Sequence, residues 1–187
     1  MQAEATGKHL TIANNPSDGT IERAMRKTRL YLDTSPIIRV GDGESPIRQA
    51  ITKEFFRVVG EKSDEYELFI SPVTLEELRD GPPEKIEEAI LFLKTLEHTE
   101  LLADTVAENL ARIYAIDGVL SQSHINDLRH VAFAVVSRGD YIITWNMKHL
   151  ANEKTVSRVN MVNGRENYGK IFIATPEFFT GGTVYGR

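Results

Sequence analysis

The sequence predicts an α/β fold with a mainly parallel sheet, and two patterns indicate it. Short apolar runs of strand length alternate along the chain with longer segments whose apolar residues recur at helical spacing. The run at 141–144 is apolar throughout, which is typical of a strand that is buried on both faces of a parallel sheet. Because strands and helices alternate, the helices are expected to pack against the sheet.

Five segments are predicted to be strands. The first, at 30–33, is the run Leu-Tyr-Leu-Asp, which ends in a carboxylate. The others are expected at 68–70, 101–102, 141–144 and 171–174, and the segment at 101–102 is the weakest of them.

The segments between the strands carry helix signals in the same order. Ser-Pro pairs at 35–36, 45–46 and 71–72 combine an N-cap residue with proline at the first helical position. Gly60 and Gly139 end two of the apolar segments of helical spacing, as glycines after helices commonly do. Further helices are expected at 86–96, after Asp104, after Ser123 and after Thr175.

The composition is that of one globular domain, with 187 residues of which 41% are hydrophobic and 26% charged. Polar residues without periodicity open the chain, so we expect a flexible N-terminal arm at 1–29 and a domain at 30–187. The absence of cysteine excludes disulfides, thiolate zinc sites and cysteine nucleophiles. We find no signal peptide and no apolar stretch of the roughly 18 residues that a membrane helix needs, so we expect a cytoplasmic protein.

The net charge of −5 is unevenly distributed. Residues 61–108 hold 14 acidic and 4 basic side chains, whereas residues 145–170 hold 5 basic and 2 acidic ones. An ordinary solvated surface would explain this pattern. A basic rim for a polyanion, next to an acidic site that binds cations, would explain it as well.

Acidic residues follow the first two predicted strands, where ligands bind in parallel sheets. Asp33 ends the first strand, although it could also simply cap the helix that follows. Glu76 and Glu77 lie in the helix after the second strand, and Glu77 lies nearer to the buried stripe that Leu75 and Leu78 define. Two solvated glutamates are the ordinary alternative.

Two further polar residues belong to later elements. Asp127 lies in the first turn of the helix after Ser123, where the helix dipole alone would favour an acid. Asn146 follows the fourth strand and is either a plain loop residue or a carbonyl ligand for a hard cation. With Asp33 and Glu77 they are expected to meet at one sheet edge, where several carboxylates stay ionised only if a cation neutralises them. Oxygen ligands favour Mg²⁺ or Mn²⁺, whose chemistry suits phosphodiester hydrolysis.

Five segments, in order and at plausible spacing, carry a family resemblance. They are Leu-Asp-Thr-Ser at 32–35, Ser-Pro-Val-Thr-Leu-Glu-Glu-Leu at 71–78, Asn-Asp-Leu-Arg-His-Val-Ala-Phe-Ala at 126–134, Asp-Tyr-Ile-Ile-Thr-Trp-Asn-Met-Lys-His-Leu at 140–150 and Ile-Ala-Thr-Pro-Glu-Phe at 173–178. With these segments the chain resembles PIN-domain proteins, specifically the VapC type of toxin ribonuclease, over about residues 30–180. The resemblance implies a three-layer α/β/α sandwich with a five-stranded parallel sheet.

The resemblance also implies Mg²⁺- or Mn²⁺-dependent cleavage of RNA. Asp33, Glu77 and Asp127 match the first three acidic positions of the family and are expected to be catalytic residues and metal ligands. Asn146 stands at a fourth position that is usually acidic, so it is expected as a further ligand and the number of metal ions stays open. Thr144 is expected to contact the metal or a phosphate through its hydroxyl.

Partners follow from the same resemblance. It implies an RNA substrate, a cognate antitoxin protein and a homodimer, and we expect Lys148 and His149 to contact substrate phosphates. Two other functions stay open. One is a PIN nuclease outside any toxin pair, acting in RNA processing or on DNA. The other is a scaffold that binds RNA or protein without catalysis, with Asn146 as a sign of lost activity.

Other chemistries fit these residues less well. His124, His130 and His149 suggest zinc, but His130 lies six positions after His124 and so on another helix face, and no histidine zinc site is expected. A haloacid-dehalogenase-like enzyme needs a second Asp where Ser35 stands, and a response-regulator receiver needs a Lys after the last strand, where Thr175 stands. The chain has no glycine-rich phosphate loop and no dinucleotide fingerprint.

Overall fold

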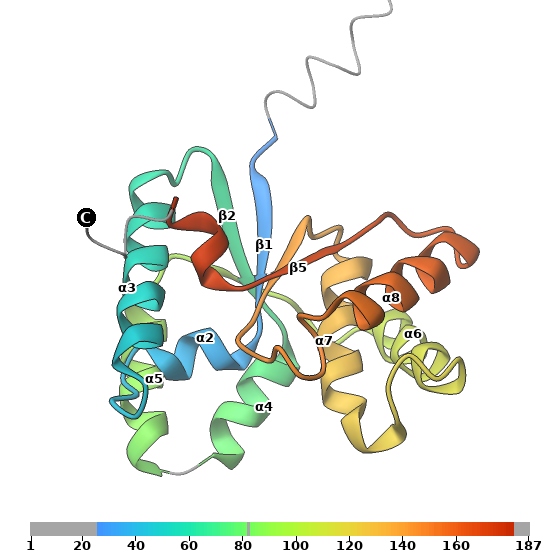
Figure 1. Cartoon of the computed structure of the whole chain (residues 1–187), viewed down its shortest axis with the longest axis horizontal. Coiled ribbons are helices and arrows are strands. Elements are labelled where there is room, and N and C mark those ends of the chain that lie inside the picture. Colours follow the sequence, from blue (N-terminus) through green and yellow to red (C-terminus); the bar gives the residue numbers. More distant parts are fainter. Residues whose placement is uncertain (1–25, 82, 182–187) are drawn as a thin grey trace, which may run out of the picture.

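Five strands form one parallel sheet in the order β3-β2-β1-β4-β5, with β1 in the middle (Figure 1). This computed structural model describes residues 26–81 and 83–181. The predicted α/β fold with a five-stranded sheet is confirmed, and all strand pairs are parallel. The strands are β1 (Thr28–Leu32), β2 (Tyr66–Ile70), β3 (Thr99–Glu100), β4 (Tyr141–Ile143) and β5 (Phe172–Ala174).

Helices cover both faces of the sheet in the described part of the chain. Figure 1 shows α3 and α5 on one side and α6, α7 and α8 on the other, which gives three layers as predicted. The helices are α2 (Thr34–Arg39), α3 (Pro46–Glu61), α4 (Pro72–Asp80), α5 (Pro83–Thr95), α6 (Thr105–Ile116), α7 (Ile125–Val136) and α8 (Glu153–Arg165), with 3₁₀ turns η1 (Gln122–His124) and η2 (Pro176–Phe179).

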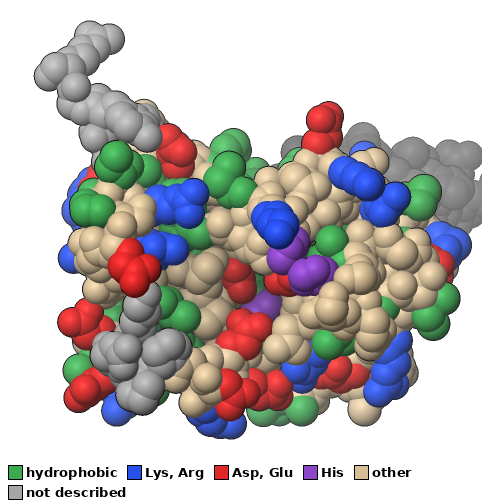
Figure 2. All heavy atoms as spheres, turned by 60° about the horizontal axis from the view of Figure 1, so that its bottom comes forward, with side chains coloured by type: hydrophobic (Ala, Val, Ile, Leu, Met, Phe, Trp, Pro, Cys, Tyr) green, Lys and Arg blue, Asp and Glu red, His purple; other side chains and the backbone are tan. Residues whose placement is uncertain are grey.

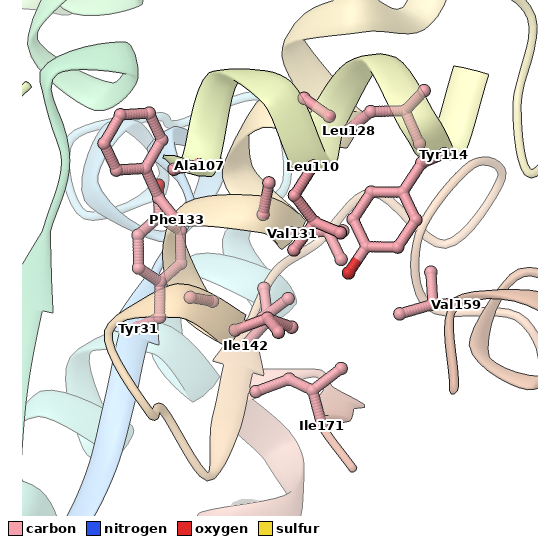
Figure 3. Close-up of a cluster of buried hydrophobic side chains, with 14 of the residues drawn as sticks. Tyr31, Ala107, Leu110, Tyr114, Leu128, Val131, Phe133, Ile142, Val159 and Ile171 are labelled. Carbon is pink, nitrogen blue, oxygen red and sulfur yellow. The ribbon is translucent and has the colours of Figure 1, made fainter. Parts of the chain in front are cut away.

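The central strand β1 is buried on both faces because its residues are apolar on both. Tyr31 packs into the cluster formed with α6, α7 and α8, which Figure 3 shows, while Leu30 and Leu32 pack into the cluster with α3 and α5. All three side chains are fully buried, and burial of each leucine stabilises the fold by roughly 1.5–3 kcal/mol. The carboxyl end of β1, where Asp33 follows, is therefore fixed between two packed layers.

Two elements differ from the prediction. β3 lies two residues before the predicted strand, although the backbone N–H of Leu101 still donates to the carbonyl of Ile70 at 2.8 Å. Helix α8 has no counterpart among the predicted elements, because its buried face includes the polar residues Thr155 and Asn163. The side chain of Asn163 is hydrogen-bonded to the hydroxyl of Tyr114, which compensates for its burial.

The start of the domain also lies slightly earlier than expected. Residues 1–25, most of the predicted arm, lie outside the described residues, and β1 begins at Thr28 rather than at residue 30. The side chain of Arg26 donates to the carbonyl of Arg138 at 2.8 Å and pairs with Asp140 at 3.3 Å. None of the described helices is long and apolar enough to cross a membrane.

Candidate active site

Asp33 follows β1 directly, and hydrogen bonds hold both of its carboxylate oxygens. Oδ1 accepts the backbone N–H of Thr34 at 2.7 Å, so Asp33 is the N-cap of α2. Oδ2 accepts the hydroxyl of Ser35 at 2.7 Å and that of Thr144 at 2.5 Å. The side chain is buried, and three donors fix its orientation. Asp33 therefore caps a helix and also occupies the sheet edge where the sequence predicts the site.

The adjacent glutamates of α4 point in different directions. Oε2 of Glu77 accepts the hydroxyl of Thr34 at 2.6 Å and lies 3.2 Å from Nε2 of His130. Glu76 instead pairs with Arg129 at 2.7 Å. The structure thus brings Glu77, and not Glu76, to the acidic site, as the position of the buried stripe predicts.

His130 belongs to this cluster although the sequence analysis does not assign it there. Its imidazole, on α7, is buried, with Nε2 lying 3.2 Å from Glu77 and 3.4 Å from Asp33. Its Nδ1 lies 2.7 Å from the hydroxyl of Tyr31. The signal that could have found it is its spacing of one helical turn from Asp127, which places both residues on the same side of α7.

Asp127 faces the loop that follows β4. Its Oδ1 accepts the amide N–H of Asn146 at 2.9 Å, and its Oδ2 lies 3.2 Å from Nδ1 of His149 and 3.5 Å from Nδ1 of His124. The carbonyl oxygen of Asn146 accepts the backbone N–H of His149 at 3.1 Å. Asn146 therefore presents its amide donor to Asp127, which differs from the expected arrangement in which its oxygen is a metal ligand.

The charges of the site influence one another. Burial acts to raise the pKa of Glu77, but the hydrogen bond and charge of His130 outweigh it, so this pKa is lowered. Burial acts to lower the pKa of His130, but Glu77 and Asp33 outweigh it, so this pKa is raised. Asp127 differs, because burial and repulsion by Asp33 together raise its pKa. The ionised form of Asp127 is thus disfavoured, whereas that of Glu77 is favoured.

The donor set fits a hard divalent cation. Asp33, Glu77 and His130 offer ligand atoms that lie within 4.8 Å of one another. Asp127 is close enough to Asp33 for their charges to repel. Figure 2 shows acidic and histidine side chains together near the middle of this face, with Lys and Arg side chains around them. Carboxylate oxygens are the ligands that Mg²⁺ and Mn²⁺ prefer, so the residues fit the expected metal.

The three predicted substrate contacts have different surroundings. Thr144 is fully buried; its hydroxyl donates to Asp33 and accepts the backbone N–H of Asn146 at 2.9 Å. In this structure Thr144 positions Asp33 and is not exposed to a substrate. Lys148 is exposed, and its ammonium group forms no ion pair with a described carboxylate. His149 is partly buried and faces the acidic site.

The chain was also compared with known proteins. No protein-family model and no curated sequence matches it. A tyrosyl-tRNA synthetase from Archaeoglobus fulgidus, complexed with L-tyrosine, aligns at 12% identity over 82% of this chain and 57% of that chain, but its TM-score of 0.39 is too low to carry an argument. VapBC2 from Rickettsia felis, crystallised with a DNA fragment from their promoter, aligns with TM-score 0.50 and 12% identity over 79% of this chain and 98% of that chain. At this identity the likeness concerns the fold alone: the chain has an α/β fold similar to that of VapBC2 and consistent with a PIN-like three-layer sandwich.

Proposed function

We propose that the chain is a Mg²⁺- or Mn²⁺-dependent endoribonuclease and the toxin of a type II toxin–antitoxin pair. The observation that carries this proposal is the placement of Asp33, Glu77 and Asp127 around the carboxyl end of a central parallel strand. The similarity of the fold to VapBC2 supports it. A carboxylate cluster with few other catalytic groups suits hydrolysis of a phosphodiester.

Each acidic residue has a distinct task in this proposal. A bound cation would supply charge for the phosphate and lower the pKa of an attacking water. Asp33 would hold the cation with a carboxylate that Thr34, Ser35 and Thr144 already orient. Glu77, oriented by Thr34, would bind it from α4. Asp127 would complete the negative site from α7, so that three separate elements fix the position of the phosphate.

The surface beside the acidic site suits a polyanion. Lys148 is exposed in the loop after β4, and Lys154 and Arg158 are exposed on α8. Cations beside an acidic centre attract a phosphate backbone without reading its sequence, and such binding weakens as salt concentration rises. We propose RNA as the substrate and Lys148 and His149 as the phosphate contacts nearest the acidic residues.

An antitoxin partner and a homodimer are part of the same proposal. One similar solved structure is that of VapBC2 with promoter DNA, which supports a protein partner for this chain. For the dimer, Phe172 and Phe178 are exposed on and beside the edge strand β5. Expression of the chain should arrest growth, and co-expression of its cognate antitoxin should relieve the arrest. Light scattering that gives the mass of a monomer, and the same mass for Phe178→Asp, would rule out a dimer through β5.

One observation favours the second candidate, a scaffold that binds RNA or protein without catalysis. His130 lies between Asp33 and Glu77, so its charged form can take the place of a cation in balancing the two carboxylates. Asn146 also directs an amide, and not an acid, toward Asp127. A nuclease that acts outside a toxin pair, in RNA processing or on DNA, has the same site and differs in its partner and its substrate.

Cleavage of RNA, measured with metal-stripped protein before and after metal is added back, distinguishes a nuclease from the scaffold. We expect cleavage only after Mg²⁺ or Mn²⁺ is added back, and none from Asp33→Asn under the same conditions. Circular dichroism of the variant checks that it is folded. Cleavage by Asp33→Asn at the wild-type rate would show that the site is elsewhere, and no cleavage of several RNAs with either metal would favour the scaffold.

A further inference from the structure

A second group of metal-binding side chains lies on the outer side of Asp127. His124 from η1, Asp127 from α7 and His149 from the loop after β4 place ligand atoms within 4.8 Å of one another. We propose that these three residues bind a transition-metal ion of the Zn²⁺ or Co²⁺ type. The site is separate from the cluster of carboxylates around Asp33, with which it shares only Asp127.

The distances match those of a coordination sphere. Metal–ligand bonds of about 2.0–2.1 Å at tetrahedral angles place neighbouring ligand atoms about 3.4 Å apart. Oδ2 of Asp127 lies 3.2 Å from Nδ1 of His149 and 3.5 Å from Nδ1 of His124. Both imidazoles therefore direct the same ring nitrogen to one carboxylate oxygen, at the spacing that a shared ion requires.

The two imidazoles are close to each other as well. The ring centroids of His124 and His149 lie 3.9 Å apart, with an angle of 46° between the ring planes. Two imidazoles on one tetrahedral ion hold their ring centroids about 5 Å apart, so the two rings must separate by about 1 Å when the ion binds. Two imidazoles that both carried a proton would repel at this distance, whereas two neutral imidazoles can bind one ion. Oδ2 of Asp127 lies within ion-pair distance of Nδ1 of both rings, so a shared ion competes with a direct ion pair between Asp127 and a protonated imidazole.

Asn146 holds two of the three ligands in place. Its amide donates to Oδ1 of Asp127, which leaves Oδ2 to face the histidines, and its carbonyl accepts the backbone N–H of His149. Such hydrogen bonds from neighbouring residues orient metal ligands in proteins. An acid at position 146 would lack this amide donor and would repel Asp127. The geometry thus gives a reason for an amide at a position that is usually acidic in the family the sequence resembles.

The donor types differ from those of the carboxylate cluster. Two imidazole nitrogens and one carboxylate oxygen suit Zn²⁺ and similar ions, whereas the Asp33 cluster offers carboxylates and the single imidazole of His130. The side chains of His124, Asp127 and His149 are 33%, 19% and 25% exposed, so solvent can reach the site and water can complete the coordination. The sequence analysis expects no zinc site because His124 and His130 lie on different faces of a helix. The fold instead brings His124 next to His149, from the loop after β4.

This inference does not rest on the proposed nuclease activity, and it is tested by metal binding alone. Untagged, metal-free protein is titrated with Co²⁺, whose visible absorption reports the number and type of its ligands. In a large excess of Mg²⁺, which fills the proposed site around Asp33, we expect one Co²⁺ ion to bind with the spectrum of a low-coordinate nitrogen–oxygen site and to be displaced by Zn²⁺. His124→Ala and His149→Ala should each weaken Co²⁺ binding at least about tenfold.

Two matched variants separate this site from other histidines and from the carboxylate cluster. His98→Ala removes a histidine just before the edge strand β3, and Glu77→Gln alters only the neighbouring cluster. Both should bind Co²⁺ as the wild-type protein does. In the wild-type protein, bound Co²⁺ should shift or broaden the ring proton signals of His124 and His149 in NMR spectra before those of His98. This measurement does not depend on the folding of any variant.

Three results would overturn the proposal. Co²⁺ binding that survives both His124→Ala and His149→Ala would place the ion elsewhere. Loss of binding in Glu77→Gln, with or without loss in His149→Ala, would assign the ion to the Asp33 cluster or to a single merged site. NMR effects on His98 or His130 without effects on His124 and His149 would contradict it independently of any substitution.

Discussion

Nε2 of His130 lies 3.2 Å from a carboxylate oxygen of Glu77, in a buried position. The pKa of His130 is raised despite its burial, because the negative charges of Glu77 and Asp33 stabilise its charged form. In the metal-free protein this histidine therefore offsets part of the charge that a divalent cation would neutralise. The relationship links the stability of the fold to the occupancy of the proposed metal site, and the predictions below follow from it and from its surroundings.

The contribution of His130 to stability should depend on pH. Its pKa in the folded protein lies above its unfolded value of about 6.5, so its contribution is complete below that pH and is lost as pH rises through the folded pKa. Urea unfolding of metal-free wild type and His130→Gln should therefore differ more at pH 6 than at pH 9. A difference in unfolding free energy that grows with pH would contradict this assignment of charge.

Asp127 should have the opposite effect on the metal-free protein. Because burial and Asp33 raise its pKa, its ionised form costs stability above the folded pKa. Asp127→Asn removes that charge, so the melting temperature of the metal-free variant should exceed that of wild type at pH 8. The gain should shrink as pH falls and Asp127 takes up a proton. A lower melting temperature at pH 8 would show that the nearby histidines already compensate for the charge.

Thr144 should act by positioning Asp33. Thr144→Val keeps the shape of the buried side chain but removes the hydroxyl that donates to Asp33, which should cost about 1–3 kcal/mol of unfolding free energy. Thr144→Ser keeps the hydroxyl and serves as the control. If the proposed nuclease activity holds, Thr144→Val should also cut RNA more slowly while Thr144→Ser stays near wild type. Equal effects of the two variants on cleavage would mean that packing, and not the hydrogen bond, is important there.

The sequence predicts the fold well because burial patterns along the chain are local signals. The apolar runs, the Ser-Pro pairs at 45–46 and 71–72 and the stop at Gly139 each mark one element, and the parallel sheet follows from their alternation. The predicted cap at Ser35 is wrong, because α2 begins at Thr34 and Asp33 is its N-cap. Helix α8 escapes prediction because two polar residues, Thr155 and Asn163, lie on its buried face. Their partners come from other elements, and no local pattern shows such partners.

The candidate site, like the fold, is predictable only where the signal lies in the local sequence. Asp33 and Glu77 are identified by their places after strands and beside a buried stripe, and the structure brings them together. His130 is not, because a buried histidine on an apolar helix face resembles an ordinary core residue until the carboxylates from β1 and α4 are placed against it. The direction of the Asn146 amide depends on one backbone N–H in its loop, which spacing alone does not specify.

The adjacent glutamates of α4 allow the most direct test of the central claim, that these carboxylates form a metal-dependent ribonuclease site. Glu77 faces the cluster and Glu76 pairs with Arg129, so Glu77→Gln and Glu76→Gln make the same chemical change one residue apart. The measurement is the rate of RNA cleavage by each variant as Mn²⁺ is added to metal-stripped protein. We expect Glu76→Gln to follow the wild-type curve and Glu77→Gln to need at least about tenfold more Mn²⁺ or to be inactive. Cleavage that proceeds without metal, or equal curves for the two variants, would contradict the account.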